Sequence, residues 1–212
     1  MPAAEFKKLN RFTTIPFAAD LLLRKKLVLI NPVFWEDFND LATVEIFREV
    51  SKKQSIYALC LTDQNETIHH WNAFATGSEG CNIEFSPRKL FAILDQIDGL
   101  SHGKVQYTRI QDLKRSKFET AQLPYLKRDP YKNENEYRLI YTNDLEQQKL
   151  FEIDIDLSII RRITITNKIP KDVFETTKAQ LLALHPGLKI YQSTIYNNSV
   201  WINHFRKILT SG

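Results

Sequence analysis

Cysteine, glycine and long apolar segments are scarce in this sequence. Only two of its 212 residues are cysteine and six are glycine, and no apolar run approaches the roughly 18 residues that a bilayer-spanning helix requires. The start of the chain has no apolar leader segment, which predicts a cytoplasmic protein. In that compartment Cys60, which lies in an apolar run, and Cys81 are expected to be buried, reduced thiols rather than a disulfide.

The signatures of several large enzyme classes are also missing. The sequence has no G-x-x-x-x-G-K-[ST] loop, no Cys-x-x-Cys and no His-Glu-x-x-His, and the segment 77–80 is too short for a dinucleotide fingerprint. These absences argue against a kinase, a zinc ribbon and a Rossmann oxidoreductase. Glu66 and His70, four residues apart on a predicted helix, are the one pair that could share a metal ion. Two ligands do not complete a site, so no metal is predicted.

What the sequence does contain indicates one globular domain over residues 1–212. Hydrophobic residues make up 43% of the chain and charged residues 25%, which is typical of globular proteins. No repeat or flexible linker divides it. Alternating or apolar segments predict strands, among them 9–13, 27–30, 55–61, 81–85, 104–110 and 136–141. Apolar spacing and capping residues predict helices at 14–25, 43–52, 87–97, 170–185 and 200–209.

The distribution of these segments predicts an α+β fold. Helices fall unevenly between the strands, which favours a single domain with a mixed, mainly antiparallel sheet of about seven strands and peripheral helices. The last predicted helix carries Trp201, Phe205 and Ile208 at helical spacing, and we expect it to dock on the core.

The net charge of +4 is unevenly distributed along the chain. Residues 1–30 contain six Lys or Arg against two acids, and residues 109–138 contain eight against five. If these regions meet in the fold, they attract an anionic ligand; otherwise they form an ordinary solvated surface.

An acidic pair stands out inside the second basic region. Glu134 and Glu136 are two residues apart at the start of a predicted strand, so their side chains are expected to face the same side, with Arg138 continuing the row. Two carboxylates this close raise the pKa of one of them, and nearby basic groups oppose that change. Paired acids stabilise the positive sugar-like transition state of glycosidic bond cleavage. The alternative is a strand edge guarded by charges.

Several segments together resemble the bacterial domain-of-unknown-function family 2971. The resemblance rests on Leu9–Phe12, Asn31–Pro32, Phe38–Asp40, Trp71–Ala75, Gly80–Phe85, Val105–Tyr107, Lys127 and Tyr131–Arg138. It covers residues 9–141, and residues 142–209 are expected to add strands and helices to the same domain. The sequence departs from the family pattern at Leu41, where proline commonly follows Asn-Asp. The family implies no settled activity.

The chain is also similar to ADP-ribosyltransferase folds. The likeness consists of an early basic strand residue, an aromatic middle segment and Glu-x-Glu entering a late strand, and it implies NAD as the substrate. By this likeness Glu136 grips the ribose hydroxyl while the nicotinamide bond breaks, and Glu134 positions the acceptor. Trp71 or Phe74 forms a wall beside the nicotinamide, and Arg11 holds a phosphate or ribose. The residues assigned to NAD binding are Arg11, Asn39, Trp71, Phe74, Lys127 and Arg138.

Three functional hypotheses follow. The leading one is an enzyme that consumes NAD, by transferring ADP-ribose to a macromolecule or by hydrolysis, in a toxin or phage-defence setting implied by the family resemblance. Replacing Glu136 by Gln is then expected to abolish activity and leave the fold intact. The alternative is a nucleic-acid or nucleotide binding module, in which basic residues neutralise phosphates and interleaved tyrosines stack on bases. Those tyrosines are Tyr107, Tyr125, Tyr131 and Tyr137. A third hypothesis is a protein of a larger assembly that uses the tail around Trp201 and Phe205 as its contact.

Overall fold

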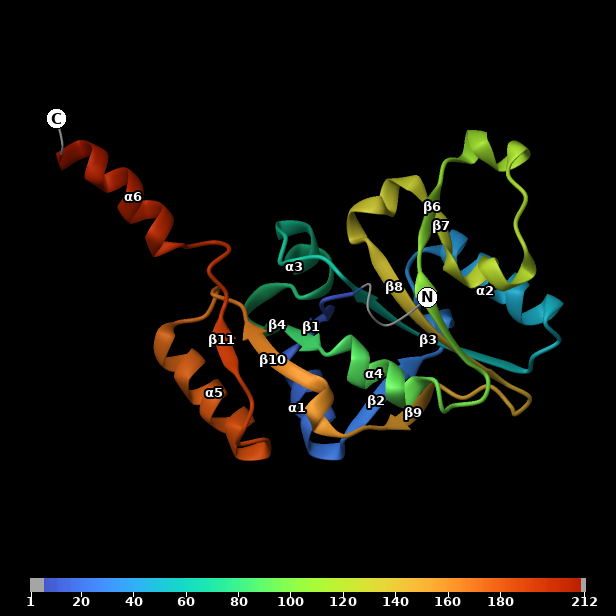
Figure 1. Cartoon of the computed structure of the whole chain (residues 1–212), viewed down its shortest axis with the longest axis horizontal. Coiled ribbons are helices and arrows are strands. Elements are labelled where there is room, and N and C mark those ends of the chain that lie inside the picture. Colours follow the sequence, from blue (N-terminus) through green and yellow to red (C-terminus); the bar gives the residue numbers. More distant parts are fainter. Residues whose placement is uncertain (1–5, 211–212) are drawn as a thin grey trace.

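A computed structural model describes residues 6–210 and confirms the α+β class, with a mainly antiparallel sheet and peripheral helices in a single domain (Figure 1). Over these residues the strands are β1 (Leu9–Thr14), β2 (Lys26–Ile30), β3 (Ser55–Thr62), β4 (Gly80–Phe85), β5 (Leu100–Lys104), β6 (Gln106–Thr108), β7 (Leu126–Arg128), β8 (Glu136–Asn143), β9 (Leu150–Asp154), β10 (Ile160–Ile165) and β11 (Ile190–Gln192). The helices over the same residues are α1 (Ile15–Arg24), α2 (Phe38–Val50), α3 (Ile68–Phe74), α4 (Pro87–Leu94), α5 (Lys171–Leu184) and α6 (Ser199–Thr210).

Strand β3 is the centre of the sheet. One edge of β3 pairs with β8 along its whole length, while the other edge is shared by β1, which pairs at Thr62, and β2, which pairs at Ala58. The path through the sheet is β11-β10-β4-β1-β3-β2-β9, with β5 added beyond β8. Among the described strands only the β10–β11 and β6–β7 pairs are parallel. The sheet therefore branches at β3, where β8 and then β5 form a side branch from the main path.

The two faces of the sheet differ in what covers them. One face carries the main apolar core, to which α1, α4 and α5 contribute buried side chains such as Leu22, Leu90 and Leu181. On the other face, residues 6–210 form two small apolar clusters. One lies beneath α2 around Val44, and the other lies beneath α3 around Trp71. Buried charged side chains on this second face reach both α2 and α3, and they form the site described below.

The structure differs from the predicted elements in three places. Over residues 6–210 the main sheet has nine strands rather than about seven. The predicted strand 104–110 is divided, because β5 ends at Lys104 and pairs with β8 whereas β6 pairs with β7. Helix α2 begins at Phe38, five residues before the predicted start. Asp37 explains this start, because its side chain accepts a hydrogen bond from the Asn39 backbone N–H at 3.0 Å and caps the helix.

The prediction that the C-terminal helix docks on the core is wrong. Helix α6 points away from the rest of the molecule (Figure 1). Its Trp201 side chain is 69% exposed and Phe205 is 47% exposed, and the two rings contact each other with their centroids 5.1 Å apart. Amphipathic spacing predicts that a helix has an apolar face, but it does not say which surface covers that face.

Both cysteines are free thiols, as predicted. Cys81 is buried and Cys60 is partly buried, and burial raises the pKa of the Cys81 thiol to about 12. Among residues 6–210, no helix combines the length and the apolar character needed to cross a membrane.

Candidate active site

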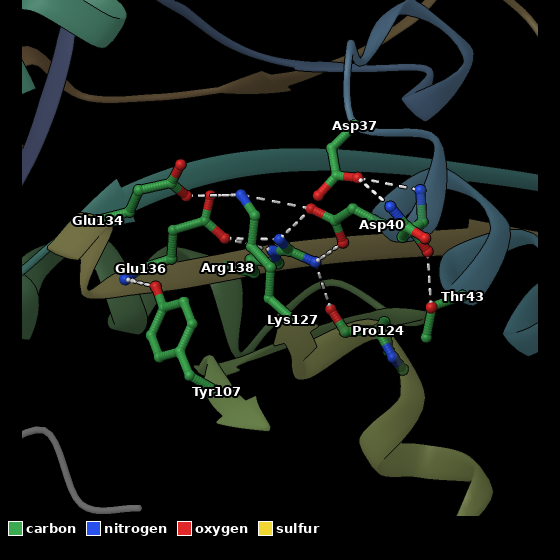
Figure 2. Close-up of polar contacts among 10 residues, drawn as sticks. Asp37, Asp40, Thr43, Tyr107, Pro124, Lys127, Glu134, Glu136 and Arg138 are labelled. Carbon is green, nitrogen blue, oxygen red and sulfur yellow. Dashed lines mark hydrogen bonds and ion pairs between the residues drawn. The ribbon is translucent and has the colours of Figure 1, made fainter. Parts of the chain in front are cut away.

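Two regions far apart in the sequence, the start of α2 and residues 127–138, bring five charged side chains together on the second face of the sheet (Figure 2). Helix α2 contributes Asp40 from its first turn and β7 contributes Lys127. The start of β8 contributes Glu136 and Arg138, and Glu134 ends the 3₁₀ turn before it. Each of these side chains is at most 8% exposed. Buried charges persist only when they are paired, so their partners define the site.

Arg138 is the central cation of this cluster. Its Nη1 and Nη2 donate to the two carboxylate oxygens of Asp40 at 2.8 and 2.6 Å, which is the bidentate geometry that suits a planar guanidinium. Its Nε and Nη2 also donate to Glu136 Oε2 at 2.8 and 2.6 Å. The backbone carbonyl of Pro124 accepts a further bond from Nη1 at 3.0 Å, and the Trp35 ring lies 4.9 Å from the guanidinium carbon. Arg138 is fully buried and holds two carboxylates in fixed positions.

Lys127 lies among all three carboxylates of the cluster. Its ammonium nitrogen is 2.5 Å from Glu134 Oε2, 3.2 Å from Glu136 Oε1 and 3.5 Å from Asp40 Oδ2. Burial lowers the pKa of Lys127, but Glu136 and Glu134 outweigh this effect and keep the pKa above its ordinary value. The cluster thus holds two cations against three acids, and it is neutral when one acid binds a proton.

A left-handed residue sets the relation between the two glutamates. Asn135 adopts φ 44° and ψ 53° between the end of the 3₁₀ turn and the start of β8, a conformation that asparagine tolerates better than most residues. The Asn135 carbonyl accepts a bond from Thr62 Oγ1 at 3.0 Å. Glu134 and Glu136 therefore both contact Lys127. From the sequence we expected the two side chains to share one side through the alternation of a continuous strand, whereas the structure brings them together through this bend.

The environments of the two glutamates set their pKa values apart. Burial raises the pKa of Glu136, but Arg138 and Lys127 outweigh burial and bring it below its ordinary value. Burial raises the pKa of Glu134 to about 7. The Lys127 ammonium opposes this increase, and the negative charge of Glu136 adds to it. At neutral pH the pair contains one ionised carboxylate and one group that readily exchanges a proton, which is the arrangement that acid–base chemistry requires.

The raised pKa of Glu134 predicts how stability changes with pH. This pKa is about 7 in the folded protein and 4.5 for the ordinary side chain, so between these values the folded state binds more protons than the unfolded state. We expect the free energy of unfolding to fall as the pH rises from about 5 to about 8, measured by urea denaturation. The Glu134→Gln variant does not titrate and should lose this part of the slope.

The comparison with Glu134→Gln is needed because His70 contributes to the pH dependence of stability with the opposite sign. Burial lowers the pKa of His70, so its contribution to stability is lost as the pH falls rather than as it rises. Both proteins contain His70, and the difference between their pH profiles isolates Glu134. Identical profiles for the wild type and Glu134→Gln would contradict the raised pKa.

A small cavity opens beside the acid pair, between β8 and α3. It measures about 50 Å³ and its lining includes Glu134, Glu136, Phe12, His70 and Phe74. The Phe12 and His70 rings are stacked with centroids 5.0 Å apart, whereas Phe74 is 42% exposed. Both glutamates therefore line a space with aromatic walls and one ring that reaches solvent.

His70 fixes the backbone of Glu134 beside the cavity. The His70 ring binds the Glu134 carbonyl oxygen through Nε2 at 2.9 Å and Thr67 Oγ1 through Nδ1 at 2.7 Å. Glu66 has other partners, because its Oε2 accepts from Trp71 Nε1 at 3.1 Å and from Ser193 Oγ at 2.5 Å. The sequence pair Glu66 and His70 thus forms two separate sets of hydrogen bonds. In the described part of the chain, no group of three or more His, Cys, Asp and Glu residues is placed to hold a metal ion.

Four of the predicted site residues lie in the charged cluster, and Phe74 lines the cavity beside it. The four are Glu134, Glu136, Lys127 and Arg138. Trp71, by contrast, is 1% exposed and packs edge-on against Phe12, so its ring belongs to the small apolar cluster beneath α3.

Arg11 and Asn39 lie apart from the cluster. Successive side chains of a strand point to opposite faces, and Phe12 contacts the His70 ring beside the acid pair. Arg11 therefore points toward the main core, on the face opposite Glu136. Burial lowers the pKa of Arg11. Asn39 is exposed at the start of α2, where its side chain donates to Asp37 at 3.1 Å.

Two residues of the site were not predicted from the sequence. Asp40 binds Arg138 from 98 positions away, and its only sequence signal was a place beside Asn39 in the family-like segment. Tyr107 Oη accepts a bond from the Glu136 backbone N–H at 2.8 Å, so this hydroxyl helps to fix the start of β8. Periodicity within one segment cannot reveal contacts between segments this far apart.

Comparison with known proteins gives distant likenesses only. The sequence matches no protein-family model and no curated protein sequence, so the resemblance to family 2971 is not confirmed. A structure of DarT from Thermus sp. 2.9 in complex with ADP-ribosylated ssDNA is similar with TM-score 0.46 and 11% identity, over 89% of this chain and 95% of that one. A structure of the same protein in complex with NAD+ gives TM-score 0.44 and 9% identity, over 89% and 96%. Likenesses this weak carry no argument about substrate or site residues.

Proposed function

We propose that this protein cleaves the glycosidic bond between nicotinamide and ribose in NAD, passing ADP-ribose to an acceptor or to water. One observation carries the proposal: Glu134 and Glu136 are buried, share Lys127, and line one cavity with opposite shifts of pKa. Support comes from these contacts of the chain itself. A toxin or phage-defence setting rests on the resemblance to family 2971 alone.

The ionised Glu136 has the charge that this cleavage needs. As the carbon–nitrogen bond breaks, nicotinamide leaves with the bonding electrons and the ribose carbon becomes positive. A carboxylate held in place before the reaction stabilises that charge without reorganising. Arg138 and Lys127 hold Glu136 ionised and oriented, and its oxygens retain the capacity to accept a bond from a ribose hydroxyl.

Glu134 is suited to handle the proton of the acceptor. When an acceptor hydroxyl or water attacks the ribose carbon, a carbon–oxygen bond forms and the oxygen must release its proton. A general base works best when its pKa lies near the working pH, and the pKa of Glu134 is raised to about 7. Glu134 takes the proton, while Glu136 stays ionised throughout.

The size of the cavity limits which part of NAD reaches the acids. A volume of about 50 Å³ is far below the roughly 300–1,000 Å³ of pockets that enclose a drug-sized ligand. In this arrangement the reacting ribose approaches from the mouth, where the exposed Phe74 ring offers a face for nicotinamide. The remainder of the dinucleotide lies outside the cavity.

The binding-module alternative has less support from the contacts. Tyr137 is 4% exposed within the core, the Tyr107 hydroxyl contacts Glu136, and Lys127 is paired with the buried acids. A stacking platform requires exposed rings beside accessible cations, and these three residues do not provide it.

The first test is incubation of the purified protein with NAD and chromatographic measurement of nicotinamide. We expect release that depends on time and on protein concentration. Parallel reactions contain single-stranded DNA, RNA or unfolded protein as acceptors, because transfer without an acceptor is slow when water is excluded. No nicotinamide above the protein-free control under any of these conditions would overturn the proposal.

A further inference from the structure

A slot lies along the outer edge of β5, between this strand and the 3₁₀ turn Thr120–Tyr125. Its volume is about 280 Å³, and its lining includes His102, Gly103, Lys104 and Ala121. This volume is close to the lower end of the roughly 300–1,000 Å³ of pockets that enclose a drug-sized ligand. The slot therefore suits a ligand about the size of a nucleobase with its sugar.

The β5 side of the slot presents a free strand edge. Over residues 6–210, β5 pairs with β8 alone. The Val105 backbone N–H donates to the Glu136 carbonyl oxygen at 2.9 Å, and the residues that exchange such bonds alternate along an antiparallel pair. The backbone N–H and C=O groups of His102 and Lys104 therefore point away from β8, toward the edge where both residues line the slot.

The ring of Tyr125 forms a wall beside this edge. Its hydroxyl donates to Ser101 Oγ at 2.8 Å, which fixes the ring against β5. Gly103 allows this close approach, because a Cβ at that position would lie 3.3 Å from the Tyr125 ring. Ala121 and Leu126 add apolar atoms, and the described lining contains no Asp or Glu. An aromatic ring next to free backbone donors and acceptors suits a flat heterocycle that also forms hydrogen bonds.

We propose that this slot binds the adenine ring of a nucleotide. Adenine carries its amino donor, N6, beside the ring acceptors N1 and N7. The His102 carbonyl oxygen can accept from N6 while the Lys104 backbone N–H donates to the neighbouring ring nitrogen, as an added strand would pair with this edge. The proposal is independent of the chemistry at Glu134 and Glu136, because it rests on β5 and Tyr125.

Calorimetric titration with two nucleotides tests the pattern of hydrogen bonds. We expect the wild type to bind AMP with a dissociation constant below about 1 mM. Inosine monophosphate should bind about tenfold or more weakly, because its ring has the same shape but reverses the donor and the acceptor on that edge. Equal affinities for the two nucleotides would overturn the proposal, as would no binding of AMP at about ten times the expected constant.

Lys104→Pro removes the backbone donor itself. That N–H points away from β8, so the substitution leaves the bonds between β5 and β8 in place, and proline is tolerated at such edge positions. AMP should bind this variant about tenfold or more weakly than the wild type. Lys104→Ala is the matched control, since it removes the ammonium but keeps the N–H, and its affinity should match the wild type. Equal affinities of the two variants would overturn the assigned contact.

Ala121→Trp tests the slot without changing β5. Ala121 is an exposed residue of the lining, so a large ring can fill the slot from the 3₁₀ turn without entering the core. This variant should retain the circular dichroism spectrum of the wild type and lose AMP binding. A folded Ala121→Trp protein that binds AMP like the wild type would overturn the proposal, whether or not Lys104→Pro folds.

The adenine ring could enter as half of NAD or as a separate nucleotide. The slot adjoins the acid cluster, because Leu126 in its lining directly precedes Lys127 and Tyr137 directly follows Glu136. AMP that raises the KM for NAD identifies the adenine half of NAD as the occupant. AMP that binds without changing this KM identifies a separate nucleotide, and either result supports the slot. A wild type that binds AMP but releases no nicotinamide would remove the proposed function and leave the slot.

Discussion

The Glu136→Gln variant should release nicotinamide from NAD at least about 100-fold more slowly than the wild type, the scale of loss seen when one preorganised electrostatic group is removed from a transition state. The substitution keeps the shape of the side chain and removes its charge. Arg138 and Lys127, which hold the carboxylate at 2.6 and 3.2 Å, would then face a neutral amide. The measurement is the initial rate of nicotinamide release at matched concentrations of folded protein.

Glu134→Gln is the matched control for this prediction. It makes the same carboxylate-to-amide change on the other side of Asn135, and it leaves Glu136 ionised. The wild-type rate should rise as the pH rises through about 7, because Glu134 acts as a base only when ionised. Glu134→Gln should be slower and should lose that pH dependence. A Glu136→Gln protein with the wild-type rate would refute the assigned role.

The structure also revises the expectation that Glu136→Gln leaves the fold untouched. Glu136 is one of two carboxylates that hold the buried Arg138, so the amide weakens a charge-assisted hydrogen bond worth about 1.5–3 kcal/mol. Circular dichroism and thermal unfolding must therefore accompany the rate measurement, so that loss of chemistry is distinguished from loss of folded protein.

The Arg138→Met variant should lose about 3–5 kcal/mol of folding free energy, the usual cost of removing one partner of a buried ion pair. Arg138 is fully buried, and without it Asp40 and Glu136 retain only the Lys127 ammonium as a cation, at 3.5 and 3.2 Å. This is a large part of the 5–15 kcal/mol that typically separates folded from unfolded domains. Urea denaturation monitored by circular dichroism measures the loss.

Lys132→Met supplies the comparison for an exposed ion pair. The Lys132 ammonium is 3.7 Å from Asp129, and the Lys132 side chain is 61% exposed. Solvent screens such a pair, so we expect no measurable change in the free energy of unfolding. If Arg138→Met were as stable as Lys132→Met, the charged cluster would not contribute to the stability of the fold.

The local parts of the fold were predictable because they depend on neighbouring residues. Apolar or alternating segments located β1, β3 and β8, and Pro87 correctly marked the start of α4. The start of α2 was missed because its cap is Asp37, which lies in a segment with no clear apolar period. The division between β5 and β6 was missed because it depends on two different partner strands, β8 and β7.

The candidate site could be predicted only where its residues are close in sequence. Glu134, Glu136 and Arg138 fall within five consecutive positions, and their charges drew attention to the segment. Arg11 was assigned to the same site by a resemblance, and the pleat of β1 places it on the opposite face of the sheet. Trp71 was assigned as a ligand wall because it is aromatic, but aromatic side chains pack in cores as readily as they bind ligands.

The sequence by itself determined the α+β class, most of the strands and helices, and the acid pair with its neighbouring cations, because these follow from periodicity, capping and the chemistry of adjacent side chains. Only the tertiary structure decided that Asp40 joins Arg138, that Glu134 and Glu136 differ in pKa, and that α6 stands away from the core. These features depend on burial and on contacts between segments up to 98 residues apart. Burial and long-range contact arise only when the chain folds, so no local pattern records them.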